Sequence, residues 1–331
     1  MVKRFGVWLM VGFLLLMTAC SGASPESESN GKKVKVVLDW TPNTNHTGLY
    51  VAKEKGYFKK QGLDVEIIQP GEAGADKMVA SGQADFGVGY QEGLTFARVE
   101  GMPIVSIAAI IQHNTSGFAS LKNKQINRPK DFVGKKYGGF GGPSELPMIQ
   151  TLMKQDKAAT QKVDMVNIGN TDFFAASKRD IDYFWIYYGW TGIEAKLRGM
   201  DLNMIYLTDY SKELDYYTPI LTTNEKKIKQ DPEQIRSFMK AVSQGYEFAI
   251  KNPEEAADLL SKAVPDLNPK LVIESQKWLS KQYQAEAKVW GVQRIEVWQN
   301  YTNWLKKNHL LKGEFDPKQA FTNQFLPNGG K

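Results

Sequence analysis

Residues 34–68 read VKVVLDWTPNTNHTGLYVAKEKGYFKKQGLDVEII, and this stretch decides the fold class. Residues 34–38 form a short run rich in β-branched side chains, typical of a strand buried on both faces. Apolar residues then return at helical spacing over 47–55, where Gly56 ends the helix, and 65–68 forms a second strand. A strand, a helix and a second strand in this order are the unit from which parallel α/β sheets are built.

The alternation continues along the chain and then begins again. Further strands are predicted at 86–89, 104–111, 135–137, 164–168 and 183–187, and further helices at 78–80, 91–100 and 146–153. From Asp231 onward the pattern is helical, and Asp231 and Asn252 each offer a cap followed by proline at the first helical position. A chain that leaves one lobe and returns to it must cross twice, which implies a hinge and a cleft. We therefore expect an α/β protein with 33–119 plus 222–331 in lobe 1 and 120–221 in lobe 2.

The first residues predict export and lipid attachment. A basic start is followed by an apolar run at 5–17, shorter than the ~20 residues that a membrane-spanning helix needs. Residues 17–20 read MTAC and resemble a lipobox, in which the cysteine is acylated after cleavage. Cys20 is the single cysteine of the chain, which excludes an intramolecular disulfide. We expect a signal peptide at 1–19, lipidation of Cys20 and a flexible tether at 20–32; the alternative is an ordinary signal peptide with an unrelated cysteine.

The charge distribution disfavours a nucleic-acid partner. The formal charge of +6 falls by two when Lys3 and Arg4 leave with the signal peptide, and the remaining lysines are scattered rather than gathered in a stripe. The three histidines are too few and too dispersed for a metal site. The sequence also lacks a nucleophile elbow or any other triad motif. We therefore expect no catalytic residue, no metal and no cofactor.

Three motifs carry a resemblance to a known family. They read LDWTPNTNHTG at 38–48, AKEKGYFKKQG at 52–62 and SGQADFG at 81–87. Together they resemble the NMT1/THI5-like superfamily, and the first is narrower than the others and resembles its pyrimidine branch. The YYGWTGIE run at 187–194 extends the likeness into the second lobe. The resemblance implies a two-lobed, periplasmic-binding-protein-like fold in which each lobe is a mostly parallel sheet flanked by helices, with a cleft between them.

The resemblance also implies a function. Members of the pyrimidine branch of this kind are solute-binding lipoproteins of ABC transporters that capture N-formyl-4-amino-5-aminomethyl-2-methylpyrimidine, a thiamine precursor, without turning it over. The implied partners are a permease and an ATPase, and the implied place is the extracytoplasmic face of the cell membrane, reached through the N-terminal lipid. The implied oligomeric state is a monomer.

Other ligands and one enzymatic reading stay open. The ligand could instead be hydroxymethylpyrimidine, the deformylated amine, or a riboflavin-like or sulfonate compound. An anion specialist should place Arg or Lys in the cleft, whereas the candidate loops at 39–46, 90, 138–144 and 185–194 contain neither. The superfamily also includes pyrimidine-phosphate synthases with a cysteine-rich iron-binding motif. The absence of any cysteine beyond Cys20 argues against a thiolate iron site here.

Candidate ligand contacts in the first lobe follow strands, where α/β sheets bind ligands. We expect Asp39 to accept from the exocyclic amine of an aminopyrimidine and Trp40 to stack on its ring, although a helix cap and lobe packing are the alternatives. Tyr90, after the third strand, would form a second aromatic wall or belong to the core. Asn114 and Ser116 lie in a polar loop at the cleft edge and could contact the ligand.

The second lobe offers a glycine-rich turn and an aromatic cluster. In GGFGGPS at 138–144, Gly141 would let backbone N–H groups reach the formyl oxygen, unless the turn is only structural. We expect Tyr188 to stack opposite Trp40, with Trp190 as a further candidate. Glu194 would be a second carboxylate for a ligand amine, or would simply lie in the first turn of a helix.

Overall fold

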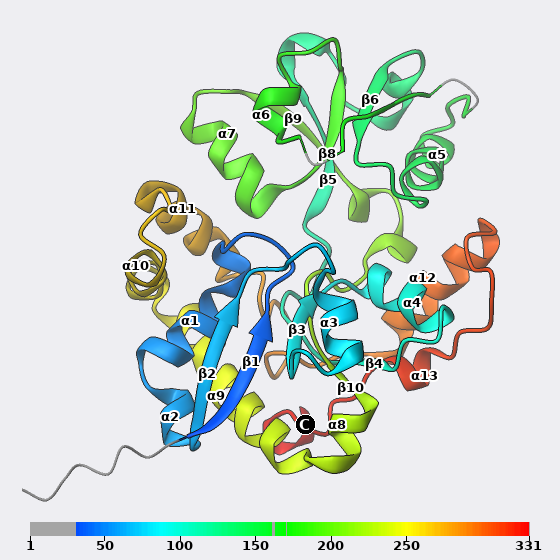
Figure 1. The fold of residues 1–331 in the computed structure, drawn as a ribbon. Helices are drawn as coiled ribbons and strands as arrows, with labels where there is room; N and C mark the ends of the chain where they lie inside the picture. Colours follow the sequence, from blue (N-terminus) through cyan, green and yellow to red (C-terminus); the bar gives the residue numbers. More distant parts are fainter. Residues whose placement is uncertain (1–30, 161–162, 170, 331) are drawn as a thin grey trace, which may run out of the picture. The chain divides into compact units, whose positions relative to one another are not determined.

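The computed structural model describes residues 31–160, 163–169 and 171–330, and these contain two five-stranded sheets (Figure 1). The predicted signal peptide, the lipidation site Cys20 and most of the predicted tether lie outside the described residues. Within the described part, no helix has the length and apolar character required to cross a membrane.

The first sheet is mixed, with one antiparallel strand. Its order is β2 (Leu63–Ile68), β1 (Lys32–Val37), β3 (Phe86–Gly89), β10 (Ile220–Asn224) and β4 (Ile104–Ala109). β1 pairs in parallel with β2 and β3, placing Val36 opposite Ile67 and Phe86, whereas β10 runs antiparallel to β3 and β4. The mostly parallel sheet expected from the alternation of strands and helices is therefore confirmed.

The second sheet repeats this arrangement. Its order is β7 (Asp164–Asn167), β6 (Lys136–Gly139), β8 (Tyr183–Tyr187), β5 (Ser116–Leu121) and β9 (Leu202–Tyr206). β6 is parallel to β7 and β8, and β5 is antiparallel to β8 and β9. In each sheet the antiparallel strand occupies the fourth place, and it is the strand that the chain enters on arriving from the other sheet.

The chain crosses between the sheets twice, after β4 and before β10. The first crossing leads directly into β5, so the second sheet begins at Ser116, a little before the boundary expected at residue 120. β10 begins at Ile220, close to the expected return at 222. Ser116 itself was expected in a loop and is instead the first residue of a strand.

Helices cover both faces of each sheet (Figure 1). Those that surround the first sheet are α1 (Thr47–Glu54), α2 (Tyr57–Lys60), α3 (Ala75–Ser81), α4 (Gln91–Val99), α8 (Glu225–Gln230), α9 (Pro232–Lys251), α10 (Pro253–Ala263), α11 (Pro269–Leu279) and α13 (Pro317–Ala320). The second sheet carries α5 (Glu145–Gln155), α6 (Phe173–Ala176) and α7 (Ile193–Leu197), while α12 (Ile295–Lys307) packs on both sheets.

Local signals explain several helix ends. Gly56 takes a left-handed φ of 69° and separates α1 from α2, as expected of a glycine stop. Pro232 and Pro253 occupy first helical positions as predicted, but neither Asp231 nor Asn252 makes a side-chain cap hydrogen bond. Asp231 instead pairs with the ammonium of Lys32. The proline, whose φ is already helical, is therefore the local signal that starts each of these helices.

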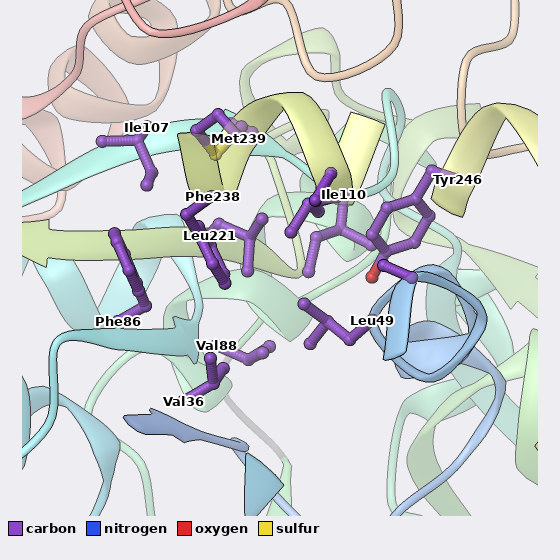
Figure 2. Close-up of a cluster of buried hydrophobic side chains, with 14 of the residues drawn as sticks. Val36, Leu49, Phe86, Val88, Ile107, Ile110, Leu221, Phe238, Met239 and Tyr246 are labelled. Carbon is purple, nitrogen blue, oxygen red and sulfur yellow. The ribbon is translucent and has the colours of Figure 1, made fainter. Parts of the chain in front are cut away.

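Strand alternation divides the core of the first sheet between its two faces. Val36 belongs to the cluster under α1 and α9, whereas its neighbour Val37 belongs to the cluster under α3 and α4. Figure 2 shows the first cluster, where Phe86 of β3 lies against Phe238 of α9 with ring centroids 3.8 Å apart. This packing fixes the ends of β1 and β3, from which the cavity-lining side chains described below extend.

Helix α12 connects the two cores. Trp298 packs in the cluster on the first sheet, while Tyr301 and Trp304, one and two turns later, pack in the cluster on the second. The indole N–H of Trp304 donates to Thr151 Oγ1 of α5 at 3.0 Å. Residues 222–331 were expected in lobe 1 alone, and the α12 contacts show that part of this segment also belongs to the packing of the second sheet.

Candidate functional site

A cavity of about 480 Å³ is lined by residues from both sheets. Its size falls in the range of small-molecule sites. The lining residues are Asp39, Trp40, Asn43, Asn45, Tyr90, Phe140, Thr171, Asp172, Phe173, Phe174, Trp185, Ile186, Tyr187, Trp190, Thr191, Glu194, Arg198 and Pro219. Of the expected ligand contacts, five line it: Asp39, Trp40, Tyr90, Trp190 and Glu194. The other four, Asn114, Ser116, Gly141 and Tyr188, do not.

Asp39 follows β1 and is held by two side chains. His46 Nε2 lies 2.6 Å from one carboxylate oxygen, and the hydroxyl of Tyr90 donates to the other at 2.5 Å. The backbone N–H of Asn43 donates to His46 Nδ1 at 3.1 Å, so the proton of a neutral imidazole lies on Nε2 and points at Asp39. Each carboxylate oxygen keeps a further lone pair for a ligand. The cap at the start of the next helical turn is Asn43, which leaves Asp39 free of that role.

The same contacts hold Asp39 in its ionised form. Burial opposes ionisation, but the electrostatic attraction and hydrogen bond of the His46 N–H and the hydroxyl of Tyr90 outweigh burial, and the pKa of Asp39 is lowered. Burial and the negative charge of Asp39 raise the pKa of Tyr90 well above its usual value, so its hydroxyl keeps its proton. The first-sheet wall therefore offers a charged acceptor whose direction is fixed by two donors.

The glycine-rich turn contributes a side chain that the sequence did not single out. Phe140 lines the cavity, while Gly141 takes a φ of +91° and lies outside the lining set. The N–H of Gly142 donates to the buried carboxylate of Glu145, which also accepts from Tyr137 Oη at 2.7 Å. This N–H of the turn is thus occupied within the lobe and does not point at the cavity.

The aromatic cluster after β8 turns a different tyrosine toward the cavity than expected. Trp185 and Tyr187 alternate onto one strand face, with ring centroids 6.4 Å apart, and both line the cavity. Tyr188, the expected stacking residue, packs instead against Trp278 and Tyr206, with centroids 5.2 and 6.0 Å apart. Tyr188 directly follows Tyr187, so the alternation of the strand already turns it to the other face, and a π-helical turn, η4 (Tyr188–Gly192), begins at this residue.

Arg198 is a second lining residue that sequence reasoning missed. Its guanidinium pairs with the carboxylate of Glu194 and lies 3.9 Å from the ring centroid of Phe174. The loops considered for cationic residues ended at 194, one helical turn short of it. The i, i+4 spacing from Glu194 on α7 is the signal that could have found it. The charge of Glu194 is therefore balanced within the cavity wall.

Asn114 and Ser116 hold the crossings together instead of lining the cavity. Asn114 Nδ2 donates to the carbonyl of Leu214 on the second crossing at 3.0 Å. Its Oδ1 accepts from the N–H of Ser116 at 2.9 Å and from the Ser116 hydroxyl at 2.6 Å. Both side chains are almost fully buried, and their hydrogen-bonding capacity is used by the chain. Polarity at the end of a strand indicated a ligand contact, but here it satisfies backbone groups at the hinge.

Within residues 31–160, 163–169 and 171–330, no group of three or more His, Cys, Asp or Glu side chains could hold a metal ion. The chemistry of the lining set is that of recognition by stacking and hydrogen bonding. Its faces are aromatic, its acceptors are carboxylates and amides, and Arg198, the one cationic side chain of this lining, is already paired with Glu194.

Two sheets joined by two crossings, with one cavity lined from both, define a two-lobed binding-protein fold. The chain belongs to the NMT1/THI5 like family, whose model matches residues 43–256. It is 27% identical to the formylaminopyrimidine-binding protein of Halalkalibacterium halodurans, over 97% of this chain and 99% of that protein. It is 25% identical to a 4-amino-5-hydroxymethyl-2-methylpyrimidine phosphate synthase of Legionella pneumophila, over 89% of this chain and 93% of that protein.

A solved structure supports the same fold. The alkanesulfonate-binding protein SsuA from Xanthomonas axonopodis pv. citri, bound to MOPS, matches with a TM-score of 0.68. The match covers 88% of this chain and 98% of that one at 12% identity. At that identity the likeness concerns the fold alone, and the two-lobed architecture expected from the sequence is confirmed.

Proposed function

We propose that this protein is a solute-binding protein that captures N-formyl-4-amino-5-aminomethyl-2-methylpyrimidine. The observation that carries the proposal is the Asp39 carboxylate, held ionised by His46 and Tyr90 at the wall of an aromatic cavity. An aminopyrimidine is flat and its exocyclic amine donates, so it needs an aromatic face and an oriented acceptor together. The named relative of H. halodurans supports the same ligand.

Within this proposal the lining residues divide the recognition between them. Asp39 accepts from the exocyclic amine, and Trp40 and Tyr187 offer faces for the ring. Glu194, steadied by Arg198, is a second acceptor, and Thr191 is a neutral donor suited to the formyl oxygen. The Glu194–Arg198 pair disfavours a free anion such as a sulfonate, because a bound anion would have to compete with the carboxylate for the guanidinium.

The delivery step and the envelope location belong to the same proposal. A two-lobed protein with two crossings can close on its ligand by hinge motion and present the closed form to a permease, which an ATPase then drives. Lipid attachment at Cys20 would hold the protein at the extracytoplasmic face of the membrane. Mass spectrometry of protein purified from membranes tests this part, and we expect a diacylglyceryl-modified N-terminal cysteine. We expect the Cys20→Ser variant to be lost from the membrane fraction.

The rival function is a pyrimidine-phosphate synthase, since a relative carries that name. Calorimetric titration of the purified mature protein separates the two. Binding of one formylaminopyrimidine per chain, with the ligand recovered unchanged, is the expected result. A pyrimidine phosphate appearing in the reaction mixture would favour the synthase, and binding only of hydroxymethylpyrimidine or a flavin would change the ligand while leaving the binding role in place.

A further inference from the structure

Two exposed aromatic side chains lie in the cavity wall. In the described part of the chain, the large apolar side chains that are strongly exposed are Trp40, Val133, Phe140 and Met165. Trp40, 52% exposed, follows β1 of the first sheet, and Phe140, 53% exposed, follows β6 of the second. Both line the cavity, whereas Val133 and Met165 do not. Apolar surface left open beside a cavity is characteristic of a ligand-binding surface.

Phe140 is the last ring of an aromatic row. Its centroid lies 5.5 Å from that of Trp185 with the planes 29° apart, and Trp185 lies 6.4 Å from Tyr187 with the planes 24° apart. Tyr187 is fixed at the other end by a 3.3 Å contact between its hydroxyl and Thr218 Oγ1. The row therefore runs from a residue anchored near the second crossing to one that is half open to solvent.

The glycines around Phe140 permit this placement. A Cβ at Gly142 would lie 2.7 Å from Phe140 Cε2, and a Cβ at Gly141 would lie 2.8 Å from Asn167 Nδ2. Gly141 also has a φ of +91°, which other residues rarely adopt. The turn is thus shaped so that the Phe140 ring can fold back over Gly142. The sequence motif that was expected to supply backbone donors instead supplies a positioned aromatic side chain.

We propose that Phe140 covers the ligand: its ring closes over the outer face of a bound planar ring, on the opposite lobe from Trp40. This inference rests on the proposed function, because it takes the ligand to be a flat aminopyrimidine. It assigns to Phe140 the covering role that we expected of Tyr188, which packs against Trp278 and Tyr206. A flat ring would cover apolar surface on both lobes at once, so binding and closure would be coupled.

Substitution of Phe140 in the full mature protein tests the proposal, with affinity for N-formyl-4-amino-5-aminomethyl-2-methylpyrimidine measured by calorimetry. We expect Phe140→Ala to weaken binding by about tenfold and Phe140→Leu, which keeps apolar bulk but no ring, to weaken it by at least about threefold. Phe140→Trp should stay within about threefold of the parent protein, because it restores an aromatic face. Val133→Ala, an exposed apolar position outside the cavity, is the matched control and should leave the affinity unchanged.

The outcomes are distinct. If the parent protein binds and both Phe140→Ala and Phe140→Leu bind equally well, the covering role is wrong while the proposed function stands. If the parent protein binds no pyrimidine, the proposed function itself fails. Because Phe140 is half exposed, all variants should keep the parent thermal midpoint. The Phe140→Leu and Phe140→Trp pair still separates ring stacking from bulk if the alanine variant folds poorly.

Discussion

The imidazole of His46 and the carboxylate of Asp39 are joined by a 2.6 Å hydrogen bond beside the cavity. Both residues belong to the DWTPNTNH run at 39–46, so the motif that carries the narrower family resemblance is also one connected unit in space. The Asn43 N–H fixes the imidazole, the imidazole fixes Asp39, and Tyr90 reaches Asp39 from the end of β3.

Replacing Asp39 by asparagine should weaken ligand binding with little change of shape. The amide would turn an N–H toward the His46 donor, the Tyr90 donor or the ligand amine, leaving two donors facing each other. Loss of one buried charged hydrogen bond is worth about 1.5–3 kcal/mol, or roughly ten- to hundredfold in affinity. Calorimetric titration measures it, with Asp85→Asn as control, since Asp85 pairs with Lys227 and does not line the cavity. Equal affinities for Asp39→Asn and the parent protein would show that the Asp39 carboxylate does not contact the ligand.

Ligand binding should change tryptophan fluorescence chiefly through Trp40. Trp185 and Trp190 also line the cavity but are only partly exposed, whereas Trp40 is 52% exposed, so a bound ring would alter the surroundings of Trp40 most. Trp40→Phe should lower the amplitude of the signal by about half or more while an aromatic face is kept. Trp304→Phe, in the core beside α5, serves as the comparison and should leave the amplitude intact. A full-amplitude signal in Trp40→Phe would contradict stacking on this residue.

Glu92 should make stability fall as the pH rises. Burial raises its pKa to about 7, the Ser144 hydroxyl bond lowers it, and the neighbouring charge of Glu145 raises it again. Because the folded-state pKa lies above the ordinary value of 4.5, the folded protein holds more protons than the unfolded chain between these values. The free energy of unfolding therefore declines as the pH rises through that window.

Glu92→Gln removes this titration. The urea unfolding midpoint of Glu92→Gln minus that of the parent protein should increase as the pH rises from about 5 to about 8. Glu296→Gln, on the exposed side of α12, should follow the parent at every pH. Parallel pH profiles for Glu92→Gln and the parent would show that the Glu92 carboxyl is not destabilised by burial.

His113 should make the free energy of unfolding fall at higher pH, because its charge stabilises contacts at the two crossings. Its Nδ1 lies 2.7 Å from Asp215 on the other crossing, and its Nε2 lies 2.9 Å from Glu286. Both nitrogens face carboxylate oxygens, so both must donate and the ring is an imidazolium. The hydrogen bond to Asp215 is the main cause that raises its pKa to about 9; burial opposes the rise and Glu286 adds to it.

A raised pKa of His113 makes the free energy of unfolding fall as the pH rises, whereas a lowered pKa of an acid would make it rise. A histidine with a raised folded-state pKa stabilises the fold fully below its ordinary value of 6.5, and this stabilisation is lost as the pH rises through about 9. His113→Gln should therefore be less stable than the parent at pH about 6, with the difference vanishing near pH about 10. Urea midpoints across this range measure it, with the exposed His309→Gln as control. A difference that is constant with pH would mean that the charge of His113 does not stabilise the hinge.

Much of the fold followed from local sequence signals. The β-branched run before Asp39 formed β1, and proline at 232 and 253 began long helices, because these preferences act within a few residues. The antiparallel strands β5 and β10 were not predicted. Their pairing partners are set by where the chain returns from the other sheet, which no local pattern records.

The site was partly predictable for the same reason. Asp39, Trp40 and Tyr90 follow strands whose ends the sequence located, and they line the cavity. The choice between Tyr187 and Tyr188 depended on where β8 ends and which of its faces borders the cavity, and that between Gly141 and Phe140 on how a glycine turn folds over itself. Such choices depend on backbone geometry beyond strand and helix periods, so residue type alone does not decide them.

Pyrimidine capture is distinguished from sulfonate capture by calorimetric titration of the mature protein with N-formyl-4-amino-5-aminomethyl-2-methylpyrimidine and, separately, with taurine. We expect one pyrimidine site per chain with a dissociation constant of about 1 μM or tighter, no heat with taurine, and weaker pyrimidine binding in Asp39→Asn. No binding of the pyrimidine at concentrations up to about 1 mM, or saturable binding of taurine in its place, would show that the protein does not capture the pyrimidine.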